Sequence, residues 1–573
     1  MYILGINAYH GDSSACILKD GKLIVGTEEE RFRRIKHWAG FPSEAIKFCL
    51  EEAGIGIEEV DYVTISRNPS ANIHKKILHS VKNLVSVKAL KDRLANSRKV
   101  SSVKAELSAA LNVPEKEIRA EIKNVEHHRS HLASAFFASP FEESAILSID
   151  GFGDFTSTMT GMGRDNQIEV LDSVIYPHSA GIFYTAMTQY LGFPHYGDEY
   201  KVMGLSPYGN PKYVEELRKL IRFKSDGLFE LQLKFFKHAK EGVSMSWEGG
   251  IPHIESIFSK ELEELFGPAR KKGEELSQKH KDLAASVQRI TEELIFHLLN
   301  HLQKKTGSKN ICIAGGVAQN SVVNGKILEK TSFEEMYIPS AGHDAGTAFG
   351  SALWVYNHEL KKQRLPAIYD AYTGYQAGEH EIEDTLKDSG VEYTKYDKTD
   401  LLETVSDFLI DGAVIGWYQG RAEFGPRALG HRSIIVDPRR DDAKELLNSK
   451  IKRRESFRPF APSILEEYVD EYFEKVDKVP FMEKVFPIKK EKHAEIPAVT
   501  HVDGSGRLQT VEKGNLYYEL IEKFRQKSGT PILLNTSFNE NEPIVNTPKE
   551  ALDCYLRTEM DVLVLGNYLV ARK

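Results

Sequence analysis

Three histidines lie close together in the segment VEHHRSHLASAFFASP, at positions 127, 128 and 131. If this segment is a helix, His127 and His131 are four residues apart and share one face. Two imidazoles on one helix face can bind a metal ion. Half-exposed histidines on an amphipathic helix are the simpler interpretation, and this segment alone favours it. The histidines become a candidate metal site only if acidic side chains elsewhere can complete it.

Two aspartates could complete such a site. Asp150 ends the apolar stretch SAILSID, and Asp344 lies in the glycine-rich loop SAGHDAG. A set of two histidines and two carboxylates suits iron, manganese or zinc better than calcium, which prefers oxygen ligands. We therefore predict a metal site made by His127, His131, Asp150 and Asp344. His128 is one residue off the shared face, so we expect it to point away from the ion.

The first turn of the chain, NAYHGDSS, holds His10 and Asp12. A histidine has a pKa near neutrality, so His10 could act as a general base. A turn histidine that hydrogen-bonds the local backbone is the alternative, and the residues alone favour neither interpretation over the other.

Four loops that follow expected strands collect glycines and polar residues: NAYHGDSS, SIDGFGD, IAGGVAQN and SAGHDAG. Their order is typical of actin-like ATPase folds, in which glycines let the backbone approach phosphates and helix N-termini favour their charge. We expect Gly315, Gly316 and Asn320 to contact a nucleotide. The segment 195–209 carries Glu199 and Lys201, and is either a solvated loop or a loop that faces substrate or nucleotide.

The elements that would position these residues can be predicted from pattern. We expect strands over 2–6, 15–19 and 23–27, and a helix with Ser43 as its N-cap. Apolar residues at 283, 287, 290, 294, 298 and 302 predict an amphipathic helix that ends at Gly307. A strand (NICIAGG), a helix (SVVNGKILEK) and a helix of small residues (GTAFGSALW) should follow.

The chain is expected to be an α/β protein of two domains. The pattern loosens around residues 357–371, so we predict a first domain over 1–356, a linker over 357–372 and a second α/β domain over 373–573. Residues 71–105 hold nine Lys or Arg against one acid. Solvated helices of an insertion are the favoured interpretation there, and a surface for an anionic substrate or partner is the alternative.

The second domain contains clustered basic residues interleaved with Gly, Pro and Phe. Arginines set on rigid loops suit a polyanionic small ligand such as a nucleoside triphosphate. Asn535 and Ser537 follow an apolar strand, where α/β folds tend to bind ligands. The candidate contacts for such a ligand are Arg421, Arg427, Arg432, Lys452, Arg454, Arg458, Arg507, Asn535 and Ser537. Nucleic acid is a weaker alternative, because the stretches lack an aromatic stacking platform.

Composition excludes several classes of protein. The 573 residues carry a net charge of −8, so the whole protein is not a polyanion binder. The four cysteines are far apart, which argues against zinc ribbons and disulfide frameworks and suits the reducing cytoplasm. We see neither a signal peptide nor an apolar run of the roughly 20 residues that a membrane helix needs, so we expect a cytoplasmic protein.

Taken together, these motifs resemble the NodU-type O-carbamoyltransferases. The matching stretches run from the first residues to about residue 546 and include GINAYHGDSSA, EEERFRRIKH, HHRSHLASAF, GRAEFGPRALGHRSI, RESFRPFAPS and NTSFN. The resemblance implies an actin-like (ASKHA) N-terminal domain of two subdomains, related to tRNA threonylcarbamoyl transferase, and a YrdC-like C-terminal domain.

The resemblance also implies a two-step reaction. Carbamoyl-adenylate would form from carbamoyl phosphate and ATP, with Mg²⁺, and its carbamoyl group would pass to a hydroxyl of a small natural-product or sugar-like acceptor, releasing AMP. Iron(II) or another divalent metal would bind the two histidines and two aspartates. His10 would be the base, Lys36 a second catalytic group, and Asp12 an acceptor contact. A homodimer is compatible with the family, and the acceptor cannot be read from the sequence.

Rival functions explain fewer of the motifs. An actin-fold sugar kinase accounts for the first domain's loops but not for the histidine pair or the arginines. A hydrogenase-maturation carbamoyltransferase would show paired CxxC fingers, which the chain lacks. A nucleotide-gated sensor or scaffold of the same fold would bind without turnover. Splitting of ATP to AMP only with carbamoyl phosphate would exclude the kinase, which gives ADP.

Overall fold

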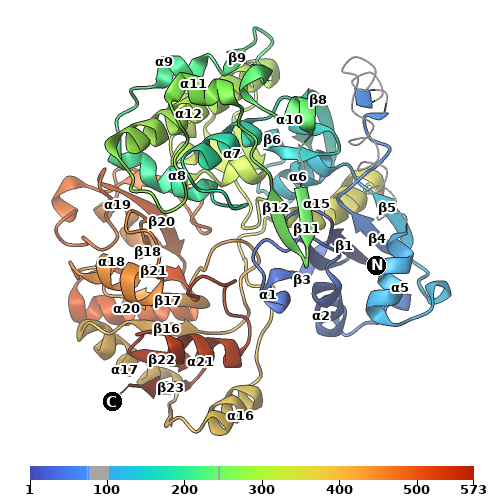
Figure 1. Ribbon diagram of the computed structural model, residues 1–573. Coiled ribbons are helices and arrows are strands. Elements are labelled where there is room, and N and C mark those ends of the chain that lie inside the picture. Colours follow the sequence, from blue (N-terminus) through green and yellow to red (C-terminus); the bar gives the residue numbers. More distant parts are fainter. Residues whose placement is uncertain (74, 77–101, 243–244, 573) are drawn as a thin grey trace. The chain divides into compact units, whose positions relative to one another are not determined.

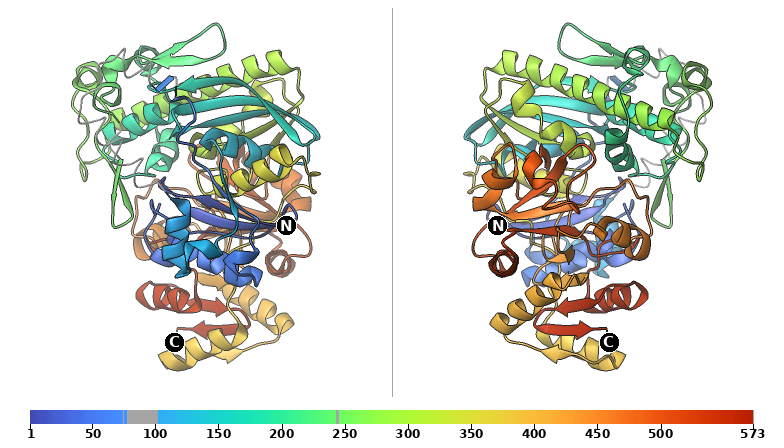
Figure 2. Two further views of the ribbon diagram at one scale, coloured as in Figure 1. Left: turned by 90° about the vertical axis from the view of Figure 1, so that its right-hand side faces the viewer. Right: turned by 90° about the vertical axis from the view of Figure 1, so that its left-hand side faces the viewer.

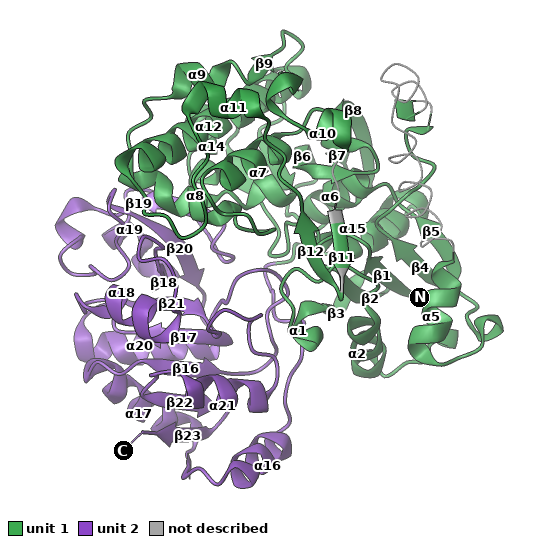
Figure 3. Ribbon diagram, viewed as in Figure 1, with its two compact units in different colours: residues 1–368 green, residues 369–573 purple. Residues whose placement is uncertain are grey.

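The computed structural model describes residues 1–73, 75–76, 102–242 and 245–572. The chain divides into two compact units, Met1–Ile368 and Tyr369–Lys573, and the division falls within the segment 357–372 (Figure 3). Most of the basic segment 71–105 lies outside the described residues. No helix in the described part of the chain is both long enough and apolar enough to cross a membrane.

The described residues of the first unit form two five-stranded sheets with one topology. The first sheet has the order β3-β2-β1-β4-β5 and the second the order β8-β7-β6-β13-β14. In each, three antiparallel strands are followed by two parallel ones. This repeated sheet is the actin-like fold that the loop order predicted. The strands are β1 (Tyr2–Asn7), β2 (Ser14–Lys19), β3 (Lys22–Glu28), β4 (Tyr62–Ile65), β5 (Glu121–Asn124), β6 (Glu143–Gly153), β7 (Thr156–Arg164), β8 (Gln167–Ile175), β13 (Asn310–Ala314) and β14 (Glu335–Tyr337).

Two helices pack against each other between these sheets. α6 (His127–Phe136) packs on β6, β7 and β13, while α15 (Gly346–Leu353) packs on β1, β2 and β4. α2 (Ser43–Ala53) covers the other side of the first sheet, and α7 (Ala180–Tyr190) and α12 (Gln278–Thr306) cover the other side of the second (Figures 1 and 2). The N-termini of α6 and α15 therefore come together where the strands β1 and β6 end.

The long helix α12 confirms the predicted amphipathic pattern. The six apolar residues of the pattern are all buried. Gly307 caps the helix with a φ of 67°, the left-handed conformation that glycine adopts without steric cost.

Three local predictions were wrong. Ser43 is the first residue of α2 and not its cap, a place taken by Pro42. The predicted single helix SVVNGKILEK is broken at Gly325 into α13 (Ser321–Asn324) and α14 (Ile327–Lys330), because glycine disfavours a helix interior. The segment 195–209 is not a loop throughout, since it contains α8 (Glu199–Leu205).

The remaining elements of the first unit are short. They are α1 (Glu30–Arg33), α5 (Val103–Leu111), α9 (Val214–Arg218), α10 (His238–Glu241), α11 (Lys260–Phe266), β9 (Ile221–Phe223), β10 (Phe229–Leu231), β11 (Met245–Glu248) and β12 (Ile251–Ile254).

The described residues of the second unit form one mixed sheet of nine strands, in the order β15-β23-β22-β16-β17-β21-β18-β20-β19. Side chains alternate across it: Ile415 and Trp417 pack with one core, while Tyr418 packs with the core on the other face. The strands are β15 (Thr394–Lys395), β16 (Ile415–Tyr418), β17 (Arg432–Val436), β18 (Ala461–Leu465), β19 (Lys484–Pro487), β20 (Ser505–Val511), β21 (Ile532–Ser537), β22 (Val562–Leu565) and β23 (Tyr568–Ala571).

Helices cover both faces of this sheet. α17 (Lys398–Ile410) and α20 (Leu516–Ser528) contribute to one core, and α16 (Glu379–Ser389) and α21 (Pro548–Arg557) to the other. The short helices α18 (Ala443–Leu446) and α19 (Val469–Tyr472) complete the unit.

Candidate functional site

The four predicted metal ligands converge in the first unit. Nε2 of His127 lies 3.3 Å from Oδ2 of Asp150 and 3.5 Å from Oδ1 of Asp344. Nε2 of His131 lies 3.1 Å and 3.4 Å from the same two oxygens. The two Nε2 atoms are 3.2 Å apart. Four donor atoms thus surround one small volume, as a bound metal ion requires.

Close contact between two helices creates this cluster. The histidines lie in the first turns of α6, and Asp344 lies just before α15. Gly350 of α15 packs directly on α6, since an added Cβ there would lie 1.9 Å from the carbonyl oxygen of Ser130. A small-residue helix is therefore needed to bring Asp344 to the histidines.

The glycine loops orient Asp150. Its Oδ1 accepts hydrogen bonds from the backbone N–H of Gly151 (2.7 Å) and of Gly316 (3.1 Å), which leaves Oδ2 facing the histidines. Gly315, the neighbour of Gly316, has a φ of 109°, and an added Cβ would lie 2.1 Å from the carbonyl oxygen of Ile149. Two of the glycines predicted to contact a nucleotide thus adjoin the metal ligands.

The donor set fits a transition-metal ion. Burial lowers the pKa of His127, but Asp344 and Asp150 outweigh this effect and raise it to about 10. Asp344 Oδ1 is buried without a hydrogen-bond partner in the described part of the chain. Two carboxylates and two imidazoles form a set that prefers iron, manganese or zinc. An ion there would replace the histidine protons and satisfy the buried oxygen.

His128 points away from the cluster, as predicted. Its ring nitrogens lie 2.7 Å from the hydroxyl of Ser148 and 3.0 Å from the carbonyl oxygen of Thr156. Both nitrogens are therefore used by second-sheet neighbours, and the ring is fully buried.

His10 lies directly beside the cluster. Its ring stacks on that of His127, with centroids 4.9 Å apart and an interplanar angle of 27°. Burial, followed by the charge of His127, lowers the pKa of His10 to about 3. The imidazole is therefore neutral at physiological pH and able to accept a proton. It makes no hydrogen bond to any residue that the structure describes.

Asp12 pairs with His37, a residue that the sequence had not singled out. His37 Nδ1 lies 2.7 Å from Asp12 Oδ1, and Glu30 accepts a hydrogen bond from the His37 backbone N–H. Burial lowers the pKa of His37, but Asp12 outweighs it and raises the value to about 9. Lys36, the predicted catalytic lysine, is exposed, so the neighbouring imidazolium is the cation held against Asp12. The motif EEERFRRIKH ends in His37, and it is the sequence signal from which this residue could have been identified.

The other predicted nucleotide contacts of this unit are held by internal bonds. Glu199 accepts a hydrogen bond from Thr185 (2.6 Å), and Lys201 pairs with Asp198 (2.9 Å) on the first turn of α8. Asn320 caps α13 and exchanges hydrogen bonds with the side chain of Gln288.

Four arginines of the second unit that were predicted to contact a ligand interact electrostatically with one another. Burial and the charges of Arg427, Arg454 and Arg458 hold the pKa of Arg507 well below its usual range. The Nε of Arg507 is buried, and its side chain makes no hydrogen bond or ion pair within the described residues. Asn448 accepts a hydrogen bond from Arg454, and Glu455 lies 3.7 Å from Arg458. We call these four arginines the arginine cluster.

Arg432 and Lys452 donate hydrogen bonds to carbonyl oxygens of their own unit. Arg432 is fully buried, lies 3.6 Å over the ring of Tyr418 and donates to the carbonyl oxygens of Gln419, Tyr375 and Gly420. Lys452 is 1% exposed and donates to the carbonyl oxygens of Ser537 and Asn539 and to the Asn539 side chain. These bonds hold the loops around both cations in place.

The last three predicted residues of this unit are also tied to neighbours. Asn535 and Ser537 lie within β21, not beyond it. Asn535 donates to Ser463 (3.1 Å) and Ser537 to Asn539 (2.8 Å). Arg421 donates to the carbonyl oxygen of Thr373 (3.3 Å).

In comparisons with known proteins, a separate family model matches each of the two units. A model described as Carbamoyltransferase N-terminus matches residues 2–353, and one described as Carbamoyltransferase C-terminus matches residues 406–572. Nodulation protein NolNO of Sinorhizobium fredii is 37% identical over 99% of this chain and 80% of its own. Nodulation protein NolO of Bradyrhizobium diazoefficiens is 40% identical over 78% of this chain and 79% of its own.

Among solved structures, (R)-2-hydroxyglutaryl-CoA dehydratase component A of Acidaminococcus fermentans covers 62% of this chain and 98% of its own, with 16% identity and a TM-score of 0.34. That likeness is too small to support a conclusion.

The first unit is thus an actin-like α/β unit with a two-histidine, two-aspartate cluster, and a second α/β unit carries clustered arginines. The chain belongs to the carbamoyltransferase family and is an enzyme that transfers carbamoyl groups.

Proposed function

We propose that this carbamoyltransferase makes carbamoyl-adenylate from carbamoyl phosphate and ATP, and passes the carbamoyl group to a hydroxyl of a small-molecule acceptor. The observation that carries the first half is Arg507. A half-buried guanidinium among three others, without a partner of its own, is unfavourable until an anion neutralises it. A ligand with several negative charges, such as Mg²⁺-bound ATP or carbamoyl phosphate, would relieve that repulsion.

The first reaction balances with water as co-reactant. Water cleaves carbamoyl phosphate to phosphate and carbamate, and a carbamate oxygen then attacks the α-phosphorus of ATP. Pyrophosphate leaves, and carbamoyl-adenylate remains. Arginines positioned around the phosphates would stabilise the charge that accumulates on them during this displacement.

The second reaction is assigned to the first unit. The acceptor hydroxyl attacks the carbamoyl carbon while His10 takes the hydroxyl proton, and AMP leaves as the new carbamate ester forms. The support for His10 is its position beside the cluster, where its ring stacks on that of His127 and makes no hydrogen bond to the described residues. The His37 imidazolium, held by Asp12, adds positive charge to the same unit.

His127, His131, Asp150 and Asp344 would hold iron(II) or another divalent metal. Such an ion supplies Lewis acidity, which polarises carbonyl or phosphate oxygens. The support for it is the donor set and the convergence of its four atoms.

The test uses the full chain with ATP, Mg²⁺ and carbamoyl phosphate but no acceptor, and measures pyrophosphate. We expect pyrophosphate only with carbamoyl phosphate, and a loss of at least about 100-fold in Arg507→Ala. Arg525→Ala is the matched control, because Arg525 is an arginine of the same unit that pairs with Glu522. Formation of ADP would favour a kinase, and binding of ATP without any product would favour a sensor or scaffold.

A further inference from the structure

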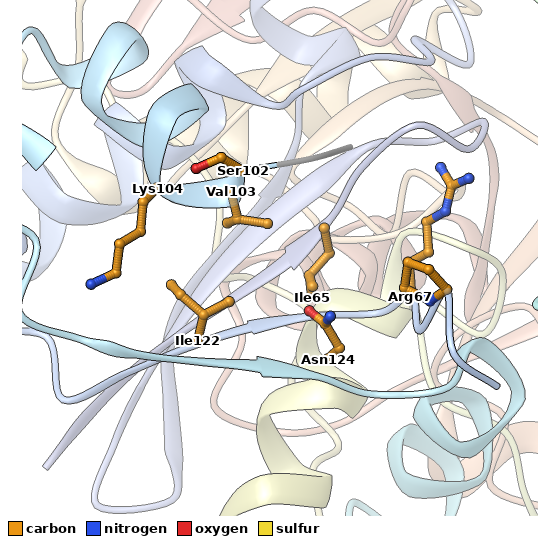
Figure 4. Close-up of a pocket in the computed structure, with 8 residues that line it drawn as sticks. Ile65, Arg67, Ser102, Val103, Lys104, Ile122 and Asn124 are labelled. Carbon is orange, nitrogen blue, oxygen red and sulfur yellow. The ribbon is translucent and has the colours of Figure 1, made fainter. Parts of the chain in front are cut away.

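A pocket of about 230 Å³ lies at the carboxyl ends of β4 and β5 in the first sheet (Figure 4). β1, β4 and β5 are parallel, so the turn after β1, which carries His10, lies at the same edge of the sheet. Ligands of α/β folds bind at this edge. The lining side chains used below are Ile65, Arg67, Val103, Lys104, Ile122 and Asn124.

Side chains connect this pocket to His10. Tyr9, the residue before His10, interacts electrostatically with Glu106 of α5, whose first turn lines the pocket. Arg67 acts electrostatically on both Tyr9 and His10. The pocket and the proposed base therefore lie at the same edge of the first sheet.

Arg67 is the unusual member of the lining. Burial lowers the pKa of its guanidinium, and the charge of Asp154 only partly offsets that effect. Asp154 accepts hydrogen bonds from the backbone N–H of Asn68 and of His127, and forms no ion pair with Arg67. Throughout the described ranges of the chain, the Arg67 side chain has neither a hydrogen bond nor an ion pair. A guanidinium in this state is positioned for a ligand anion.

The remaining walls define what else would fit. Lys104 donates to the carbonyl oxygen of Ile118, so its ammonium is already used. Figure 4 shows Arg67 and Lys104 on opposite sides, with Ile65, Val103, Ile122 and Asn124 between them. These walls suit a carbon skeleton with a few polar groups, and a single anionic group at Arg67.

We propose that this pocket binds the acceptor, and that the acceptor carries an acidic group, a carboxylate or a phosphate, which pairs with Arg67 and directs a hydroxyl toward His10. The inference rests on the proposed function, because it assigns the substrate class of that reaction. A neutral acceptor would leave the half-buried guanidinium without a partner, which is costly.

The test compares three small probes that share hydroxyl groups: glycerol, glycerol 3-phosphate and glycerate. Titration calorimetry measures their binding to the full-length wild type, to Arg67→Gln and to Arg164→Gln. Arg164 is the matched control, since it is an exposed arginine of the same unit that pairs with Glu143. Binding of the acids to the arginine cluster is common to all three proteins and cancels in the comparison.

We expect at least one acid to bind the wild type about tenfold or more tightly than glycerol, and Arg67→Gln to lose that difference. The acid with the larger loss identifies phosphate or carboxylate as the preferred group. Equal binding of acids and glycerol, or acid binding that Arg67→Gln leaves intact, would overturn the proposal. If Arg67→Gln does not fold, Arg67→Lys replaces it and should retain the charge but lose part of the affinity.

The pyrophosphate assay separates this inference from the proposed function. Arg164→Gln, the exposed control, should form pyrophosphate at the wild-type rate. A wild type that forms pyrophosphate but shows no acid preference would refute only the acidic acceptor. A wild type that shows the preference but forms no pyrophosphate would refute only the adenylate chemistry.

Discussion

At the scale of single residues, His127 and Arg507 have opposite electrostatic surroundings. Two carboxylates face the imidazole of His127, whereas three other guanidinium groups surround the guanidinium of Arg507. The carboxylates stabilise positive charge beside them, whereas the arginines repel one another in the absence of an anion. The first therefore suits a bound cation and the second a bound anion, and both expectations can be tested by substitution.

Removal of one metal ligand should abolish metal binding. We expect His131→Ala to reduce the metal content of purified protein from about one ion per chain to below about one tenth, because one of four donors is lost. Inductively coupled plasma mass spectrometry measures the content. His253→Ala, which removes an exposed histidine of β12, is the control and should keep the ion. Full metal content in His131→Ala would remove this histidine from the ligand set.

Removal of charge from the arginine cluster should stabilise the ligand-free protein. Arg507→Met relieves repulsion among four arginines, so we expect the free energy of unfolding to rise by about 1 kcal/mol and the melting temperature by about 2–4 °C. ATP with Mg²⁺ should raise the melting temperature of the wild type more than that of the variant. Differential scanning fluorimetry measures both. A large destabilisation by Arg507→Met would mean that Arg507 has a structural role.

The pair of Asp12 and His37 predicts a pH dependence. His37 has a folded-state pKa of about 9, above its ordinary value of 6.5, so the pair stabilises the fold fully below about pH 6.5. That contribution is lost as the pH rises through about 9. In Asp12→Asn, the pKa of His37 should fall below 6.5, because burial then acts without the carboxylate. NMR titration of labelled imidazoles follows the change, and an unshifted His37 would contradict the assigned pairing.

At the scale of elements, the crossing of α6 and α15 determines the site. α6 supplies both histidines and packs on the second sheet, whereas α15 follows Asp344 and packs on the first. The contact between Gly350 and the backbone of Ser130 sets how closely the helices approach. The metal cluster thus depends on a residue that touches none of its ligands.

Gly350→Ala should disturb both stability and metal binding. The added methyl group would collide with a backbone oxygen, so we expect a loss of about 1–3 kcal/mol in the free energy of unfolding and a lower metal content. Denaturant unfolding and metal analysis measure the two effects. Gly151→Ala is the stability control, because an added methyl group there meets no atom within 4 Å. Equal stability of the two variants would show that the helices can separate without cost.

At the scale of the whole molecule, the two proposed half-reactions are assigned to two units with separate folds. The second unit has hydrophobic cores of its own on each face of its sheet. Ligands of one unit should therefore stabilise that unit first, because local stability follows the contacts of each cooperative region.

Metal removal should show this independence in the full chain. After chelation, we expect hydrogen exchange to accelerate in α6 (His127–Phe136) and in residues 341–346, while β20 (Ser505–Val511) keeps its protection. Hydrogen exchange measured by mass spectrometry resolves these segments. Equal acceleration in β20 would mean that the units unfold together.

Much of the fold followed from local patterns in the sequence. The first three strands and α12 were predicted correctly, because side-chain periodicity reports which face of an element is buried. The candidate metal cluster could be assembled from the i,i+4 spacing of His127 and His131 and from two aspartates beside glycines, and the structure brings these four side chains together. The failures were also local: the segment 195–209 contains a helix despite its glycines and proline, and one predicted helix is broken at Gly325.

Only the tertiary structure decided which charged residues are paired within the protein. In the sequence, Arg432 and Lys452 are indistinguishable from Arg507, yet the first two donate to backbone carbonyl oxygens, whereas the Arg507 side chain has no hydrogen bond or ion pair among the described residues. Arg67 and His37 could be recognised as candidate site residues only from the structure, which shows Arg67 in the pocket lining and His37 beside Asp12. A residue's type and spacing determine the chemistry that it can perform, whereas burial and neighbours distant in the chain determine whether its donors remain available.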